Sequence, residues 1–475
     1  MRRGRVLAAA LAVVGVVGVA AAFAATVRVS WGYAIEVSGS AALNTGGSAM
    51  TNSVACASAG RCDAGGTYQD GSGHNQAFVV SEKNAEWGRA IEVPGTAALN
   101  TGGSAQVAAV SCATAGNCAA VGNYEDVAAH QQALVVNEAN GIWGSAIEVP
   151  GTAALNTGGD ARVSSVSCTG TGNCAAAGSY LDGSGFYQVF VVTETSGVWH
   201  TAIEVPGTAA LNASGDARIY GNGVSCASAG NCEVGGSYRD GSGHHQAFVV
   251  SETSGVWHTA IEVPGTAVRN AGGDASVSSV SCATVGNCAA GGSYKDGAGR
   301  NQAFVVSETS GVWHTAIEVP GTATLNAGGI AKVSSVSCVT AGNCAAGGSY
   351  RDGSGHFQAF VASETSGVWH TAIEVPGTAV RNAGGNASVS SISCATAGNC
   401  AAGGYYRDGS GHYQVFVGGE SNGVWGTARE LPGTAALNLG DAILESVSCA
   451  KSGNCAVGGY YSEGGAVDQA FVTAP

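Results

Sequence analysis

SETSGVWHTAIEVPGTA, residues 251–267, recurs without change at residues 307–323 and 363–379. A further copy at residues 193–209 differs only in its first residue, a threonine. Exact repetition over this length indicates a chain built from copies of one structural unit, so the period has to be established before any motif is interpreted.

Tryptophan and cysteine mark the period. One tryptophan stands at the same place in each unit: Trp31, Trp87, Trp143, Trp199, Trp257, Trp313, Trp369 and Trp425. Sixteen cysteines form eight C-x5-C pairs, and successive pairs lie 55 to 58 residues apart, the longest step including residues 219–223. The sequence therefore predicts eight units of about 56 residues that fill residues 25–475 as a single domain.

Each unit contains four short segments with the composition of β-strands. In one copy these are residues 275–282, 288–294, 302–308 and 312–319, separated by segments rich in Gly, Asn, Asp and Ser. Strand alternation in the last segment would place one set of side chains on one face: Trp313, Thr315, Ile317 and Val319. No segment has helical periodicity.

Four strands per unit and eight units predict an all-β fold, an eight-bladed β-propeller. Each C-x5-C pair would link the first two strands of a blade, and each tryptophan would seal its blade against a neighbour. The chain begins with a lone fourth strand at residues 29–37 and ends with a third strand at residues 468–475, so the first would complete the last blade and close the ring. The alternatives are an open solenoid, which would need distinct capping repeats, and a different partition of the units into rings.

Residues 1–24 have the layout of a secretory signal peptide, with Arg2, Arg3 and Arg5 before an apolar run and Ala22-Phe23-Ala24 at its end. An uncleaved membrane anchor is the alternative. In an oxidising compartment the cysteine pairs predict disulfides, because structural zinc sites favour shorter spacings. The expected pairs are Cys56–Cys62, Cys112–Cys118, Cys168–Cys174, Cys226–Cys232, Cys282–Cys288, Cys338–Cys344, Cys394–Cys400 and Cys449–Cys455.

The chain is acidic. Its formal net charge is −14, and removal of a leader that contains three arginines would make it more negative. Lysine and arginine total 19, without a basic run. Nucleic acid and anionic membrane surfaces are bound through clustered positive charge, so we expect neither as a partner.

The segment YRDGSGHHQAFVV, residues 238–250, and its copies resemble the HAF-type repeats of bacterial extracellular proteins, although Gln stands where that motif has His. The resemblance implies a secreted, propeller-like repeat protein without a defined activity. Residues 249–263 also resemble the tryptophan-docking motif of eight-bladed quinoprotein dehydrogenases, in blade construction only. We find no equivalent of the cofactor pocket of those enzymes and expect no cofactor.

Strand order places the loops between second and third strands on the same face as the connections between blades. Candidate ligand-binding residues in those loops are an acidic ring, Asp70, Asp126, Asp182, Asp240, Asp296, Asp352, Asp408 and Glu463, and exposed tips, His74, His244, His356 and His412. Such a ring could recognise a polar ligand such as a glycan. The alternative is that these acids, like the asparagines of the connections, only cap turns.

Metal and catalytic sites are not indicated. Each loop offers one carboxylate, whereas calcium takes six to eight oxygens. His258 and Glu262 share a strand face but stand about 13 Å apart. The glutamates that end the third and fourth strands point to opposite rims, so they do not form the carboxylate pair of a glycosidase.

Near-identical units favour weak multivalent binding over a unique catalytic centre. We therefore expect a secreted or cell-surface, monomeric, non-catalytic protein that binds a polysaccharide or another envelope component. One alternative is a glycan-active enzyme, whose singular residues would be departures from the repeat: residues 125–130 and 218–222, Arg269, Arg381 and Lys451. The other is a purely structural surface protein.

Overall fold

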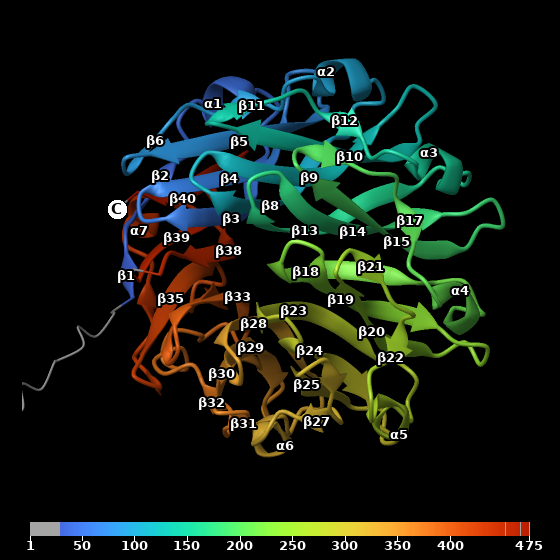
Figure 1. Ribbon diagram of the computed structural model, residues 1–475. Helices are drawn as coiled ribbons and strands as arrows, with labels where there is room; N and C mark the ends of the chain where they lie inside the picture. The colour runs from blue at the N-terminus through green and yellow to red at the C-terminus, as the bar shows by residue number, and fades with distance from the viewer. Residues whose placement is uncertain (1–28, 452, 466, 475) are drawn as a thin grey trace, which may run out of the picture.

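Eight antiparallel blades form a ring in the computed structural model, which describes residues 29–451, 453–465 and 467–474. The colour gradient runs once round the ring, and the blue and red ends meet at β2 and β40 (Figure 1). The expected fold, an all-β eight-bladed propeller, is confirmed. The predicted signal peptide lies outside the described residues.

Each blade has three long strands and a fourth divided in two. Blade 1 comprises β3 (Ala49–Ser58), β4 (Arg61–Gln69), β5 (Asn75–Lys83), β6 (Glu86–Trp87) and β7 (Ile91–Glu92). Blades 2 and 3 comprise β8 (Gln106–Thr114), β9 (Asn117–Glu125), β10 (Gln131–Ala139), β11 (Ile142–Trp143), β12 (Ile147–Glu148), and β13 (Ala161–Gly170), β14 (Asn173–Leu181), β15 (Tyr187–Thr195), β16 (Val198–Trp199), β17 (Ile203–Glu204). Blades 4 and 5 comprise β18 (Arg218–Ser228), β19 (Asn231–Arg239), β20 (His245–Thr253), β21 (Val256–Trp257), β22 (Ile261–Glu262), and β23 (Ser276–Thr284), β24 (Asn287–Lys295), β25 (Asn301–Thr309), β26 (Val312–Trp313), β27 (Ile317–Glu318). Blades 6 and 7 comprise β28 (Ala331–Thr340), β29 (Asn343–Arg351), β30 (Phe357–Thr365), β31 (Val368–Trp369), β32 (Ile373–Glu374), and β33 (Ala387–Thr396), β34 (Asn399–Arg407), β35 (Tyr413–Ser421), β36 (Val424–Trp425), β37 (Arg429–Glu430).

Blade 8 closes the ring as expected. It combines β38 (Ala442–Cys449), β39 (Asn454–Gly464) and β40 (Val467–Ala474) with β1 (Ser30–Trp31) and β2 (Tyr33–Glu36). β2 pairs with β40 in antiparallel register. β1, however, pairs in parallel with β39, the second strand of this blade.

The expected alternation of the fourth strand is wrong. Trp313, Ala316 and Val319 are buried, whereas Ile317 is 38% exposed. The strand breaks because the amide of Ala316 donates to the carbonyl of Pro264, in the connection that enters the blade, rather than to the third strand. Three residues therefore separate β26 from β27, and the buried side chains recur every third residue.

The connections between blades contain one-turn helices, where the sequence predicted none. Among the described residues these are α1 (Ser40–Leu43), α2 (Thr96–Leu99), α3 (Thr152–Leu155), α4 (Thr208–Leu211), α5 (Thr266–Arg269), α6 (Thr322–Leu325) and α7 (Thr434–Leu437). A single turn is too short to show a helical period. The glycine before each turn has a positive φ, for example 88° at Gly95, which explains why every copy has glycine at this position.

The core lies between neighbouring blades. A typical cluster combines Val249 of blade 4 with Val277, Val280 and Phe304 of blade 5. The small residues of the second strand allow this close packing: a Cβ on Gly291 would lie 2.6 Å from Val333 of the next blade. All eight expected disulfides are present and link the first two strands of each blade.

Serine hydroxyls join the innermost strands. The Ser281 hydroxyl accepts the amide N–H of Cys338 in the next blade at 2.9 Å, and the Ser279 hydroxyl accepts that of Val336 at 3.0 Å. Equivalent bonds close the ring between blades 8 and 1, where the hydroxyls of Ser446 and Ser448 are the acceptors. The repeated motif V-S-S-V-S-C is therefore a polar seam between blades.

No helix in the described part of the chain is both long and apolar enough to span a membrane.

Candidate functional surfaces

On the loop face, the predicted acidic ring is part of the turns themselves. Asp70 Oδ1 accepts the amides of Ser72 and His74 at 2.8 and 3.0 Å, and Oδ2 accepts the Gln76 side chain at 2.9 Å. The hydrogen bond from Gln76 contributes most to holding the pKa of Asp70 below its ordinary value. The same two amide bonds and glutamine bond occur at Asp126, Asp182, Asp240, Asp296, Asp352 and Asp408.

The network continues into the next connection. The Asn100 amide group donates to Gln76 Oε1 at 2.8 Å, and Asn100 Oδ1 accepts the amide of Ser104. Each glutamine that stands where HAF-type repeats have histidine thus links an aspartate to a buried asparagine. This chain of Asp, Gln and Asn confirms that loop and connection lie together on one face and fixes the loop's shape.

The histidine tips project from this frame. His74, His244, His356 and His412 are exposed. The ring of His74 lies over Gly103, where a Cβ would come within 2.7 Å of it. The tip position holds Phe186 in blade 3 and Arg300 in blade 5, so it is here that the loops differ chemically. Glu463, at the end of β39, is exposed and lies near Tyr461.

Two of the residues that depart from the repeat, and that were considered as catalytic candidates, make local contacts. Arg218 pairs with Asp216 at 2.7 Å and its guanidinium stacks over Tyr187. Arg269 donates to the carbonyl of Ala316. None of the departures lines any of the clefts described next.

The opposite face, which carries the hairpin turns, is hollowed between blades. We call these hollows the interblade clefts. They measure about 680 Å³ between blades 3 and 4, 770 Å³ between blades 4 and 5, 240 Å³ between blades 5 and 6, and 360 Å³ between blades 1 and 2. His200, His258 and His314, which follow tryptophan in the repeat, each line one of them.

A polar relay joins neighbouring blades at four of the interfaces between them. The Trp369 indole N–H donates to the Ser307 hydroxyl of the preceding blade at 3.0 Å, and Ser307 donates to Glu364 at 2.7 Å. The same relay is made by Trp143, Ser81 and Glu138, by Trp199, Asn137 and Glu194, and by Trp425, Ser363 and Glu420. The tryptophan therefore seals the blades through its N–H as well as its apolar surface.

Two clefts hold an additional acid that the sequence interpretation missed. The residue after the second cysteine is alanine at Ala119, Ala175, Ala289, Ala345, Ala401 and Ala456. It is Asp63 in blade 1 and Glu233 in blade 4. A position-by-position comparison of the repeats would have found both, since RCDA and NCEV stand where five other copies read NCAA and the last reads NCAV.

Glu233 lies at the floor of the largest cleft. One carboxyl oxygen of Glu233 and one of Glu308 lie within 4.8 Å of each other. Burial, together with the charge of Glu308, raises the pKa of Glu233 to about 9. Burial also raises the pKa values of Glu252 and Glu308, which line the same cleft, to about 7.

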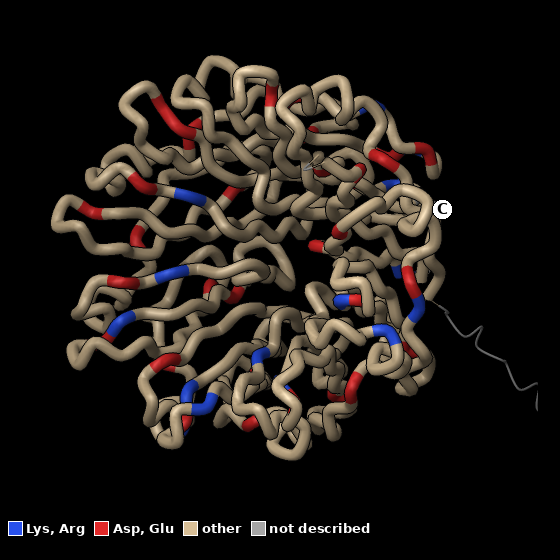
Figure 2. Tube along the Cα trace, turned by 180° about the vertical axis from the view of Figure 1, so that it is seen from behind, with Lys and Arg blue, Asp and Glu red and all other residues tan. Residues whose placement is uncertain are grey.

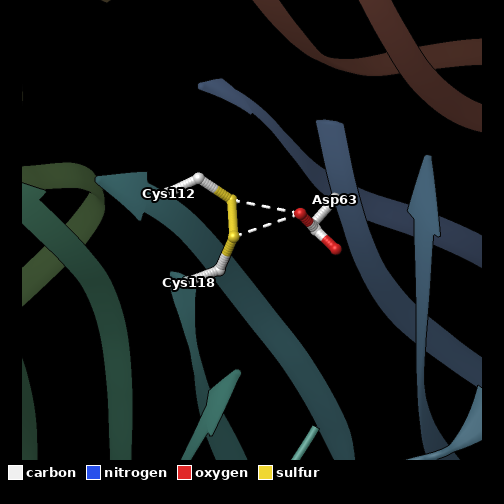
Figure 3. A group of neighbouring side chains, drawn as sticks. All are labelled: Asp63, Cys112 and Cys118. Carbon is white, nitrogen blue, oxygen red and sulfur yellow. Dashed lines mark hydrogen bonds between the residues drawn. A yellow bond between two sulfur atoms is a disulfide. The ribbon is translucent and has the colours of Figure 1, made fainter. Parts of the chain in front are cut away.

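Asp63 is the added acid between blades 1 and 2, and one of its carboxyl oxygens also lacks a hydrogen-bond partner. Its carboxyl lies 3.1 Å from Cys118 Sγ and 3.5 Å from Cys112 Sγ (Figure 3). Disulfide sulfurs carry no proton, so this contact is a hydrogen bond only when Asp63 is protonated and donates. Burial, with a further contribution from the charge of Glu138, raises the pKa of Asp63 to about 7, and Lys83 opposes this shift.

Acidic and sulfur atoms come together as potential metal ligands at two places in the described residues, around Asp63 and around Glu233. The cysteines of both groups are bound in disulfides, so neither offers a thiolate. Elsewhere on the surface, Lys and Arg are scattered among Asp and Glu around the ring rather than gathered in one region (Figure 2).

The fold and its disulfides define the chain as an eight-bladed β-propeller with one disulfide in each blade. No family model and no curated protein matches it, so the resemblance to HAF-type repeats stays a prediction. Among solved structures, it is similar to the BP39L lectin from Burkholderia pseudomallei, with a TM-score of 0.42, 13% identity, and coverage of 81% of this chain and 99% of that one. YCF48 from Cyanidioschyzon merolae is similar with a TM-score of 0.42 and 11% identity, over 93% of this chain and 99% of that one. The β-propeller domain of the Trilobed protease from Pyrococcus furiosus has a TM-score of 0.42 and 9% identity, over 81% of this chain and 97% of that one.

Proposed function

We propose that the protein is a secreted or cell-surface, non-catalytic propeller that binds a glycan or another polar polymer of the envelope through its loop face. Eight disulfides fit an oxidising compartment, as does the leader-like sequence of residues 1–24. Repetition of one loop around the ring would give several weak contacts to a repeating polymer, whose combined avidity exceeds that of any single contact.

The observation that carries this proposal is that some residues of each loop hold its shape while others are exposed at its tip. The aspartate, glutamine and asparagine of each loop are committed to one another, as at Asp70, Gln76 and Asn100. Ligand contacts would therefore come from the exposed tips, His74, His244, His356 and His412, held by a rigid frame. A preformed loop loses little conformational entropy when it binds, which favours affinity from few contacts.

The test is binding of the purified, oxidised protein to a glycan array and to envelope polysaccharides. A variant with the four tip histidines changed to alanine should lose at least tenfold in affinity. A control variant changes His200, His314 and His370, which occur in the repeat after tryptophan, are exposed on the hairpin side and lie outside the cleft between blades 4 and 5. Equal weakening by both variants would contradict the loop-face proposal. No saturable binding by the parent protein would contradict it as well and would favour a purely structural protein.

A further inference from the structure

The cleft between blades 4 and 5 differs from its counterparts in its floor. Glu233, Glu308 and Trp313 are each at most 7% exposed and line a volume of about 770 Å³. The rim is exposed and includes Thr253, His258 and Val312, so the cleft opens to solvent. No Lys or Arg is among the residues that line it, and the acids therefore have no internal counter-charge.

Polar atoms at this floor lack hydrogen-bond partners within the described chain. They are one carboxyl oxygen each of Glu233, Glu252 and Glu308, and the indole N–H of Trp313. The Trp313 N–H faces Glu233 but does not reach it with hydrogen-bond geometry. Between blades 1 and 2, 5 and 6, and 6 and 7 the equivalent N–H donates to a serine hydroxyl, as Trp369 does to Ser307, and between blades 2 and 3 it donates to Asn137. Between blades 4 and 5 Ser251 faces Glu233 instead, so the added carboxyl has broken the relay.

Such a floor is costly without a ligand. A buried polar group that lacks its hydrogen bond destabilises the fold, and two acids at this distance resist joint ionisation. In the cleft between blades 5 and 6, where alanine stands at the position of Glu233, the Trp369 N–H has its acceptor and there is no added acid beside Glu364, although one oxygen of Glu364 also lacks a partner. A ligand that supplied the missing partners in the cleft between blades 4 and 5 would offset this destabilisation.

The missing partners define the ligand's chemistry. The two carboxyl groups accept hydrogen bonds and favour a positive charge, which a primary ammonium with three N–H donors supplies. The indole N–H is a donor only and needs an acceptor such as a hydroxyl. A metal ion is a poorer fit, because the third group near the acids, Cys288, is in a disulfide, and two carboxyls fall short of a usual ligand set.

Ammonium and hydroxyl groups on one compact molecule are the features of an amino sugar with a free amine. The cleft volume lies within the range of small-ligand sites. Val249, Ile261 and Val312 supply apolar lining for the C–H face of a pyranose ring. We propose that this cleft binds a de-N-acetylated hexosamine unit, and that Glu233 is the residue that distinguishes it from its counterparts. The identity of the ligand as part of a glycan rests on the function proposed above.

Proton release would accompany binding. The charged groups facing Glu233 in the cleft are Glu252, Glu308 and, at the rim, His258. With no ammonium present, burial keeps Glu233 protonated near neutral pH. An ammonium ion favours the carboxylate, so the proton leaves Glu233 as the ligand enters, and the affinity should rise with pH until the ligand amine itself loses its proton.

The test is isothermal titration calorimetry of the oxidised protein with the β-1,4-linked disaccharide of glucosamine, compared with its di-N-acetylated form. We expect one site, affinity at least tenfold weaker for the acetylated sugar, and a heat that varies with the buffer's ionisation enthalpy. Glu233→Ala restores the alanine of six other blades, so it should fold, and it should weaken binding at least tenfold. Trp313→Phe should weaken it less. Equal binding of both sugars, or wild-type affinity in Glu233→Ala, would overturn the inference.

Ala175→Glu provides the converse experiment. It places a carboxyl at the same position in the cleft between blades 3 and 4, which measures about 680 Å³ and contains Glu252. We expect the stoichiometry to rise from one to two, and a value that stays at one would refute the role assigned to Glu233.

The four-histidine tip variant separates the two proposals. It should retain glucosamine binding. If it abolishes polysaccharide binding while Glu233→Ala leaves glucosamine binding unchanged, the cleft inference fails and the loop-face function stands. If it leaves polysaccharide binding unchanged while Glu233→Ala weakens glucosamine binding, the loop-face function fails and the cleft inference stands.

Discussion

The hydroxyl of Ser307 accepts a 3.0 Å hydrogen bond from the indole N–H of Trp369, which belongs to the next blade. The Ser307 hydroxyl in turn donates to the carboxyl of Glu364, the residue that pairs with Trp369 across the strands of blade 6. One contact thus ties together the third strand of one blade and the outer edge of its neighbour. It explains why serine, glutamate and tryptophan recur together in the repeat.

Trp369→Phe should lower the free energy of unfolding by about 1 kcal/mol more than Trp313→Phe does, because only Trp369 loses a hydrogen bond. Both substitutions remove similar apolar area, so each controls for the other. Urea unfolding followed by circular dichroism measures the difference. Equal losses in the two variants would show that the relay adds nothing beyond packing.

The serine seam makes a second prediction. Ser281→Ala should cost about 1–3 kcal/mol, because the amide of Cys338 is left without its acceptor between the inner strands. A change in the opposite direction, at the other serine position of the seam, is Ala109→Ser, which restores the serine found at Ser165 and Ser279 and should stabilise the ring. Thermal unfolding of the two variants should shift in opposite directions. A neutral Ser281→Ala would mean that water replaces the hydroxyl.

Glu233 should make the stability of the protein depend on pH. Its pKa in the folded state is about 9, above the ordinary value of 4.5, so between these values the folded chain binds more protons than the unfolded one. The free energy of unfolding therefore falls as pH rises through this window, by up to about 1.4 kcal/mol per pH unit from this residue. Glu233→Ala should be more stable than wild type at pH 8 and should lose most of that advantage by pH 5. Parallel pH profiles for the two proteins would rule out a buried, strongly shifted Glu233.

The loop frame can be tested one blade at a time. Asp352→Ala removes the acceptor of the Ser354 and His356 amides and of the Gln358 side chain. Hydrogen exchange of those amides should accelerate at least tenfold, while the equivalent loop at Asp240 keeps its protection. Asp352→Asn, which retains one acceptor oxygen, should have the smaller effect. Unchanged exchange in Asp352→Ala would mean that the backbone alone holds the turn.

Much of the architecture could be predicted because it depends on short-range pattern. Eight tryptophans at one spacing set the number of blades, and the C-x5-C pairs had to close locally because each pair brackets a tight turn, as Cys282 and Cys288 do. The match between residues 29–37 and the incomplete last unit predicted closure, which β2 and β40 confirm. The aspartates of the loops were predicted with two roles left open. The structure gives their structural role, and their role in binding stays a proposal.

The sequence by itself determined the period, the strands, the disulfide pairs and the closure of the ring, because each follows from residues close in the chain or from the count of repeats. Only the tertiary structure decided which residues of neighbouring blades meet. The fourth strand is interrupted because the Ala316 amide donates to the carbonyl of Pro264, and packing of blades 4 and 5 brings the carboxyl groups of Glu233 and Glu308 close together. These contacts join residues of different units, and their geometry depends on how two sheets pack, which no local pattern encodes. The candidate site in the cleft depends on such packing, and the sequence alone did not reveal it.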